Sequence, residues 1–229
     1  MKVIITQSNY IPWKGYFDGI AQSDVFVVYD DMQYTRRDWR NRNMIKTSQG
    51  LKWLSVPVEV KGKYFQKIND TMIADVNWNM HHWQQISQNY CKAPFFKELS
   101  PWVENLYREA VYPSLTEINL HFLKAICAFL NIKTVFRDSR EFNLAEGKTE
   151  RLVEICKELK ATDYFTGPAA RNYMEENLFA ENNINIHYFD YAGYNEYHQL
   201  YPPFEHGVCI WDLLFNMGSE SKNYLKYIG

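Results

Sequence analysis

Residues 2–30, KVIITQSNYIPWKGYFDGIAQSDVFVVYD, decide the fold. Two apolar runs, KVIIT at 2–6 and DVFVVYD at 24–30, enclose a short amphipathic segment, GYFDGIAQS, at 15–23. Continuous apolar runs are typical of strands buried on both faces, and the periodicity between them favours a helix. We therefore predict a β-α-β unit within a parallel sheet, with ligand sites at the carboxyl ends of its strands.

The second half of the chain returns to the same alternation. Strands are expected at 132–136, 163–167 and 184–190, and helices at 148–160, within 169–182 and at 210–217. Gly218 is expected to end the last of these helices, and a short final helix follows it.

The middle of the chain has a different pattern. Residues 51–60, LKWLSVPVEV, alternate apolar and polar around Pro57, which suits an edge strand of a hairpin. The period becomes helical from Asn77 to Leu130, with Pro101 expected near a helix start. We predict one α/β domain over residues 1–229, with a Rossmann-like, mainly parallel sheet and a helical insert at about 77–131.

Charge and composition exclude several classes of protein. The 229 residues carry 25 Lys and Arg against 27 Asp and Glu, so no overall field attracts nucleic acid or an anionic membrane. The start, MKVIITQSNY, lacks a signal-peptide cleavage site, and no apolar stretch reaches the roughly 18 residues of a membrane span. Four scattered cysteines without a CxxC pattern indicate reduced packing residues. We expect a cytoplasmic protein without structural zinc.

A long polar segment follows the second strand. Within residues 30–46, five basic side chains (Arg36, Arg37, Arg40, Arg42 and Lys46) stand against three acidic ones (Asp30, Asp31 and Asp38). Arginine forks suit bidentate recognition of phosphate or carboxylate. Neutral donors and stacking rings accompany them: Gln33, Asn41, Asn43, Tyr34 and Trp39. The alternative is a solvated loop whose arginines pair with its own aspartates. Because long polar loops in compact domains are usually functional or disordered, and the aromatic residues argue against disorder, we predict a ligand site here.

Three further segments add candidate binding residues near the ends of expected strands. After the first strand these residues are Gln7, Tyr10, Trp13, Gly15 and Tyr16, and in the second half they are Lys148, Thr149, Arg151, Thr166 and Gly167. The start of a helix favours an anion, so Lys148, Thr149 and Arg151 could bind one. The alternative is that Thr149 simply caps this helix. No Walker A sequence accompanies them, so a P-loop is excluded.

The candidate acids and bases are few. His198 and His206 flank a proline-rich turn, where His198 could act as a general base if it faces the cleft. Asp212 lies among apolar residues, so we expect it to cap a helix or to hold an arginine of the loop. No HExxH or GxSxG pattern occurs, and we expect no metal site.

Several long segments resemble one protein family. They are QSNYIPWKGYFDGIAQSDVFVVYDDMQYTRRDWRNRNMIKT at 7–47, WLSVPV at 53–58, KTERLVEICKELKATDYFTGPAARNY at 148–173 and WDLLFNMG at 211–218. They are similar to the WbqC-like family over nearly the whole chain. The resemblance implies a role in bacterial surface-polysaccharide (O-antigen or capsule) biosynthesis, with transfer of glycine or a related acyl group to an amino sugar. It assigns no catalytic residue.

A second similarity concerns the first crossover. The segment YIPWKGY before DVFVV is similar to the start of nucleotidyltransferase-type Rossmann folds, in which a His-x-Gly-His signature contacts phosphates. The matching positions here are Trp13, Gly15 and Tyr16, and both histidines are absent. The similarity leaves nucleotide binding open and puts nucleotidyl transfer in doubt.

Our leading hypothesis is an enzyme that binds a nucleotide-linked amino sugar and forms an amide on its amine. It assigns Arg36, Arg37, Arg40 and Arg42 to the diphosphate, Trp39 or Tyr34 to stacking, and Asp30 or His198 to the base. The acyl donor stays open among an amino acid with ATP, a carrier thioester and a charged tRNA. The rivals are a non-catalytic nucleotide- or glycan-binding module and, least favoured by the charge balance, a nucleic-acid-binding protein. The sequence leaves open whether the chain forms a homo-oligomer.

Overall fold

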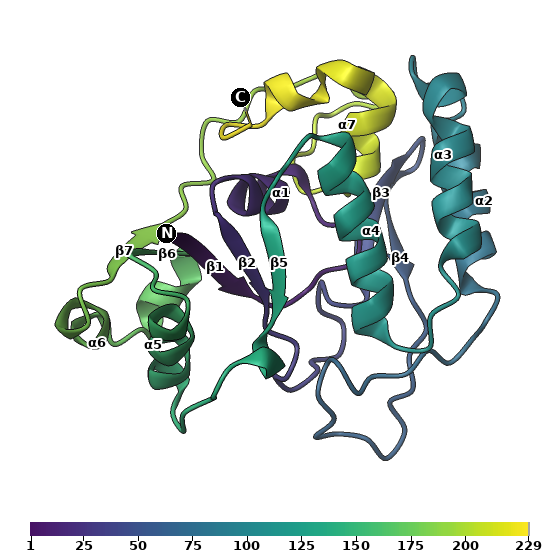
Figure 1. Cartoon of the computed structure of the whole chain (residues 1–229). Coiled ribbons are helices and arrows are strands. Elements are labelled where there is room, and N and C mark those ends of the chain that lie inside the picture. The colour runs from purple at the N-terminus through teal and green to yellow at the C-terminus, as the bar shows by residue number, and fades with distance from the viewer. Residues whose placement is uncertain (229) are drawn as a thin grey trace.

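The computed structural model describes residues 1–228, and its centre is a five-stranded parallel sheet (Figure 1). The strands are β1 (Lys2–Thr6), β2 (Val25–Val28), β5 (Val135–Asp138), β6 (Asp163–Thr166) and β7 (Asn185–Tyr188). Their spatial order is β5-β2-β1-β6-β7, and every neighbouring pair runs parallel. The predicted α/β class with a mainly parallel sheet is confirmed.

The strand order changes direction beside β1. The chain moves outward from β1 through β2 to β5, and then returns to β6 on the other side of β1. At such a point the connections on the two sides diverge beyond the carboxyl ends of the central strands, where open α/β sheets bind ligands. The topology therefore marks the boundary of β1 and β6 as the place to expect a site.

Helices cover both faces of this sheet. The side chain of Ile4 belongs to one apolar core, whereas its neighbours Val3 and Ile5 belong to the other, because successive residues of a strand face opposite ways. The first core includes side chains of α1 (Lys14–Ala21), α4 (Leu115–Phe129) and α7 (Ile210–Met217). The second includes those of α5 (Lys148–Glu158) and α6 (Glu176–Glu181), which lie across the sheet from α4 (Figure 1).

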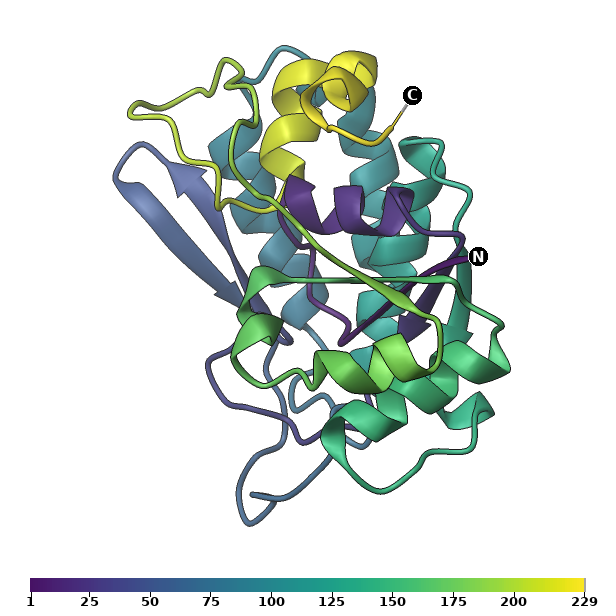
Figure 2. The same ribbon diagram turned by 90° about the vertical axis from the view of Figure 1, so that its left-hand side faces the viewer.

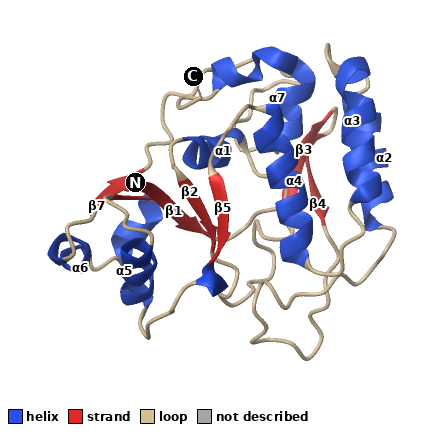
Figure 3. Ribbon diagram, viewed as in Figure 1, coloured by secondary structure: helices blue, strands red, loops and turns tan. Residues whose placement is uncertain are grey.

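An antiparallel hairpin stands apart from the main sheet (Figure 3). It consists of β3 (Arg42–Thr47) and β4 (Gly50–Ser55), and it lies at one side of the molecule in Figure 2. The expected strand at 51–60 is thus shorter, and the end of the expected polar loop is a strand. Asn43 and Ile45 are buried on alternate positions of β3, and Gly50 closes the turn at φ +104°, which favours glycine.

Three helices connect the hairpin to β5. They are α2 (Trp78–Tyr90), α3 (Phe96–Glu109) and α4. We expected Pro101 near a helix start, but α3 begins five residues earlier, at Phe96. The proline therefore lies inside the helix, beyond its first turn. Ser114 and Glu117 form a reciprocal capping box at the start of α4, which satisfies amide groups that have no partner within the helix. The expected helical stretch is therefore confirmed, with one start misplaced.

The last helix ends as its sequence indicates. Gly218 follows α7 with φ +54°, and a Cβ atom there would lie 2.3 Å from the ring of Phe95. A 3₁₀ segment, η3 (Gly218–Tyr224), follows it as the expected final helix. No helix within residues 1–228 is both long and apolar enough to cross a membrane.

A buried polar network joins the turn after β1 to the helices. The Tyr10 hydroxyl lies 2.8 Å from His82 Nδ1 and 2.9 Å from the Tyr107 hydroxyl, and the Trp211 indole N–H donates to Tyr107 at 3.1 Å. Burial lowers the pKa of His82 from 6.5 to about 4. The imidazole is therefore neutral at physiological pH, and its protonation opposes folding.

This network predicts a pH dependence of stability. Between pH 6.5 and 4 the unfolded chain binds a proton at His82 that the folded chain excludes, so His82 lowers the free energy of unfolding as the pH falls. Replacing His82→Gln should remove up to about 3 kcal/mol of the loss between pH 7 and pH 4, measured by urea denaturation. His81→Gln, an exposed neighbour, is the control. Parallel pH profiles for wild type and His82→Gln would contradict the assignment.

Candidate functional site

The largest cavity described lies where the topology places a site. It has a volume of about 900 Å³ and is lined by Thr6 and Gln7 after β1, Tyr29 and Asp31 after β2, Thr166 and Gly167 at the end of β6, and the start of α5. We call it the switch-point cavity. All of these segments reach it because carboxyl ends of parallel strands meet at one edge.

The switch-point cavity is rich in basic side chains. Arg40, Lys67, Lys148 and Arg151 line it, against Asp31 and Glu146. Lys67 and Lys148 are exposed, so their ammonium groups can turn towards a ligand. The chain has a net charge of -2, but this cavity has a surplus of positive charge, which favours an anionic ligand here.

The start of α5 adds to this character. Gly147 precedes it with φ +102°, a backbone conformation that favours glycine. No side chain caps this helix start. Thr149 is buried, and its hydroxyl accepts from the amide of Glu175 at 3.3 Å. The alternative prediction, in which Thr149 caps this helix, is therefore wrong. Uncapped amide groups at a helix start favour anionic ligands.

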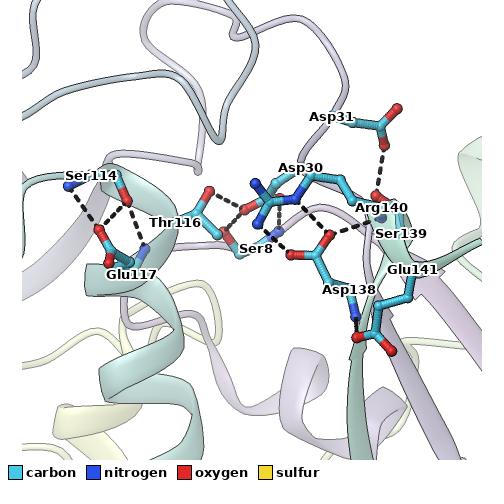
Figure 4. Close-up of polar contacts among 10 residues, drawn as sticks. All are labelled: Ser8, Asp30, Asp31, Ser114, Thr116, Glu117, Asp138, Ser139, Arg140 and Glu141. Carbon is cyan, nitrogen blue, oxygen red and sulfur yellow. Dashed lines mark hydrogen bonds and ion pairs between the residues drawn. The ribbon is translucent and has the colours of Figure 1, made fainter.

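Arg151 is held on one side of the cavity. Its guanidinium pairs with Asp31, which also accepts from the Ser139 hydroxyl at 2.7 Å (Figure 4), and it lies 5.4 Å from the centre of the Tyr29 ring. Its Nε is buried without a hydrogen-bond partner among residues 1–228. A buried donor left without a partner is costly.

A second cavity lies beside the first. It has a volume of about 400 Å³ and is lined by Asn9, Pro12, Trp13, Trp39, Asn43, Tyr191, His206 and Gly207. We call it the aromatic cavity. Trp13 and Tyr191 meet edge to face, with ring centres 5.3 Å apart. No Lys, Arg, Asp or Glu lines it, so its chemistry differs from that of the switch-point cavity.

The structure brings part of the predicted site together. The switch-point cavity contains six of the candidate binding residues, Gln7, Arg40, Lys148, Arg151, Thr166 and Gly167. The aromatic cavity contains three more, Trp13, Trp39 and Asn43.

Other arginines of the polar loop do not converge on either cavity. Arg36 donates to the carbonyl of Val60 at 2.7 Å, and Arg42 donates to the carbonyl of Arg37. Arg42 also lies over the Trp53 ring at 4.0 Å. These side chains satisfy backbone carbonyls of irregular segments, which otherwise lack partners. They hold the loop in place, and Arg37 is exposed.

The neutral candidates of the loop also serve its structure. The Gln33 amide donates to the Tyr64 carbonyl at 3.0 Å, and the Asn41 amide donates to Val56 at 2.8 Å. Tyr34 is buried in the core, and the structure places it outside both cavities.

In the first β-α junction too, some of the candidate residues serve the structure and do not line a cavity. Tyr10 is wholly buried, and the Tyr16 hydroxyl donates to the Gln7 carbonyl at 2.7 Å. Gly15 lies under the Trp13 indole, where a Cβ atom would come within 2.3 Å of the ring. Gly15 therefore allows Trp13 to lie flat against the start of α1.

Neither predicted base lines either cavity. Asp30 is buried and accepts from the amide and hydroxyl of Ser8 at 2.8 and 2.6 Å, and from the Thr116 hydroxyl at 2.7 Å (Figure 4). Burial raises its pKa, and these three donors oppose the rise. His198 is exposed. His206, on the other side of the same turn, is the histidine that reaches a cavity, and no local sequence signal distinguished the two.

Asp212 neither caps a helix nor holds an arginine of the loop, so both expected roles are wrong. It accepts from the hydroxyls of Tyr90 and Tyr197 at 3.0 and 2.8 Å and from the Gln199 amide at 2.8 Å. Burial raises the pKa of this carboxyl group. Its partners are hydroxyls and an amide, and no arginine of the loop is among them.

Metal ligation has no visible basis in the described part of the chain. No group of three or more His, Cys, Asp or Glu side chains within residues 1–228 could hold an ion. Cys127, Cys156 and Cys209 are buried and Cys91 is exposed, and all four are free thiols.

The fold is that of an α/β protein with two cavities at the carboxyl edge of a parallel sheet. The chain belongs to the WbqC-like protein family, whose model matches residues 7–224. It is 51% identical over 226 residues to a Mycobacterium tuberculosis (strain ATCC 25618 / H37Rv) protein named "Uncharacterized protein Rv1507c", and the match covers 99% of this chain and 98% of that relative. No solved structure matches the chain. The family resemblance inferred from the motifs is thus confirmed.

The environment of Asp30 predicts the effect of replacing it. Asp30→Asn exchanges one acceptor oxygen for an amide that cannot accept from Ser8 or Thr116. Leaving buried donors unsatisfied should lower the free energy of unfolding by about 1–3 kcal/mol, measured by urea denaturation. Asp24→Asn, at an exposed carboxylate that accepts from the Lys2 amide, is the control. An Asp30→Asn protein as stable as wild type would contradict this structural role.

Proposed function

We propose that the protein acylates the amine of a nucleotide-linked amino sugar, with glycine or a related acyl group, during bacterial surface-polysaccharide (O-antigen or capsule) biosynthesis. The observation that carries this proposal is the pairing of a basic cavity with an uncharged aromatic one at the carboxyl ends of the strands. The motifs shared with the WbqC-like family support the same function.

The switch-point cavity suits the nucleotide half of such a substrate. Its volume of about 900 Å³ falls within the range of small-molecule sites. Lys67, Lys148 and Arg40 can contact the diphosphate, and the start of α5 adds backbone donors. Tyr173, which is exposed at the rim, offers a ring for the base.

The reaction itself forms one bond and breaks one. The neutral sugar amine attacks the carbonyl carbon of an activated acyl ester or thioester, a C–N bond forms, and the leaving group departs with the electron pair of the C–O or C–S bond. The amine proton passes to a base. The negative charge on the carbonyl oxygen during this step requires fixed hydrogen-bond donors.

A second candidate function is a non-catalytic module that binds the same ligand. The observation that favours it is the position of Asp30 and His198, since neither lines either cavity. The two functions are distinguished by whether the protein forms an amide product. The purified protein, with a nucleotide sugar bound, is incubated with each acyl donor in turn: glycine plus ATP, a glycyl thioester, or glycyl-tRNA. Mass spectrometry then detects or excludes the amide.

The proposal predicts selective binding of nucleotide sugars. UDP- and dTDP-linked amino sugars, ATP, CTP and acyl-CoA are compared by thermal unfolding. A ligand at 100 times its dissociation constant stabilises by about 2.7 kcal/mol, which raises Tm by roughly 5–10 °C for a chain of this size, at 2–4 °C per kcal/mol. We expect this shift with a nucleotide-linked amino sugar.

The matched variants lie on one helix. Lys148→Met should raise the dissociation constant of that ligand about tenfold, because a charge-assisted contact contributes roughly 1.5–3 kcal/mol. Lys157→Met, which removes a surface lysine paired with Glu154, should leave it unchanged. Absence of binding by every nucleotide sugar, or equal binding by the two variants, would refute the assignment of the cavity.

A further inference from the structure

We propose that the aromatic cavity is the subsite for the pyranose ring of the ligand, and that His206 accepts the hydrogen of its amine. The inference rests on the proposed function and specifies where its acceptor lies. It gives a role to the aromatic cavity and to His206, which was not among the predicted bases.

The lining of the aromatic cavity matches a sugar ring. A pyranose has an apolar C–H face and a polar rim, so aromatic faces with a few polar side chains suit it. Trp39 and Tyr191 are 41% and 40% exposed, which leaves large ring faces open at the cavity. Asn9 lies among them. The lining holds no carboxylate, ammonium or guanidinium group, so it offers a phosphate no opposite formal charge.

The aromatic walls are held in place before any ligand binds. Gly15 lets the Trp13 indole lie against α1, and Tyr191 packs edge to face on it at 5.3 Å. The Trp39 carbonyl accepts from the Tyr10 amide at 3.1 Å, and its ring lies 5.3 Å from that of Trp53. Preorganised rings lose little conformational entropy on binding.

The two cavities are adjacent, because residues that line one contact residues that line the other at two points. Arg40 lines the switch-point cavity and donates to Asn9 Oδ1 in the aromatic cavity. Gly167 lines the first cavity, and a Cβ atom on it would lie 3.6 Å from the hydroxyl of Tyr191 in the second. A diphosphate beside Arg40 therefore places an attached sugar next to Trp39 and Tyr191.

His206 supplies the acceptor for the amine. Its Nδ1 is buried without a hydrogen-bond partner among residues 1–228, and its ring packs edge to face on Phe204 at 4.6 Å. Burial and the positive charge of Lys14 lower its pKa, while Glu196 and Glu205 raise it. A neutral imidazole has one nitrogen free to accept. Because Nδ1 is buried, the nitrogen that a ligand can reach is Nε2. When the amine attacks the acyl ester or thioester, Nε2 takes the proton and the ring becomes imidazolium.

The ring subsite is tested by isothermal titration with UDP-glucosamine and with UDP alone. Trp39→Leu and Trp13→Leu should each weaken binding of UDP-glucosamine about fivefold to tenfold and leave UDP unchanged, because only the sugar contacts these rings. Tyr112→Leu, at a partly exposed ring outside both cavities, is the control. Equal losses for UDP and UDP-glucosamine, or no loss for either, would overturn the subsite.

The role of His206 is tested with pairs of ligands that differ only at the amine. Wild type should bind UDP-glucosamine more tightly than UDP-glucose, or a dTDP-linked 4-amino sugar more tightly than its 4-hydroxy counterpart. His206→Leu should remove that preference while UDP binds unchanged. His198→Leu, on the exposed side of the same turn, should keep the preference. If neither pair shows a preference that His206→Leu abolishes, His206 is not the acceptor.

Failure of the proposed function can be distinguished from failure of this inference. If neither UDP nor any nucleotide sugar binds wild type, the nucleotide assignment is wrong. The subsite is then probed with methyl β-D-glucosaminide by saturation-transfer NMR. A signal in wild type that disappears in Trp39→Leu supports the sugar subsite, and no signal in wild type overturns it.

Discussion

Two consecutive carboxylates at the end of β2 hold the layers of this molecule together. Asp30 turns towards α4 and the turn after β1, where Ser8 and Thr116 donate to it (Figure 4). Asp31 turns towards α5, where Arg151 pairs with it. Both residues lie in the turn after β2 and their side chains face different layers, so one dipeptide contacts helices on both faces of the sheet. Buried carboxylates are tolerated because each is hydrogen-bonded, and that requirement fixes the backbone around the switch-point cavity.

Two cavities of different chemistry lie next to each other in this structure. Charge is concentrated at the start of α5 and on Arg40 and Lys67, whereas the neighbouring cavity presents aromatic faces without a formal charge. Arg40 belongs to the first cavity and donates to a residue of the second. Desolvating an anion requires charged or amide donors, while a sugar face gains most from flat apolar surface, so separate cavities serve the two better than one mixed cavity.

The fold was predictable because its signals are local. The apolar runs of β1 and β2 are buried on both faces, and the turn and cap residues act within a few positions, as Gly218 does after α7. The polar loop was predicted less well. Its arginines have the right chemistry for a ligand, but Arg36 and Arg42 satisfy carbonyl groups of irregular backbone instead. A sequence does not show which carbonyls will lack a partner, because that depends on the packing of distant segments.

By itself, the sequence determined the α/β class, the parallel sheet, the family and the edge of the sheet at which the two cavities lie. Those properties follow from hydrophobic periodicity and from long motifs. Only the tertiary structure decided which candidates meet, because Gln7, Lys148 and Thr166 are far apart in the chain and converge only when the sheet assembles. The choice between His198 and His206 was decided there as well. The two histidines flank one turn, and only packing against the aromatic residues determines which imidazole faces a cavity.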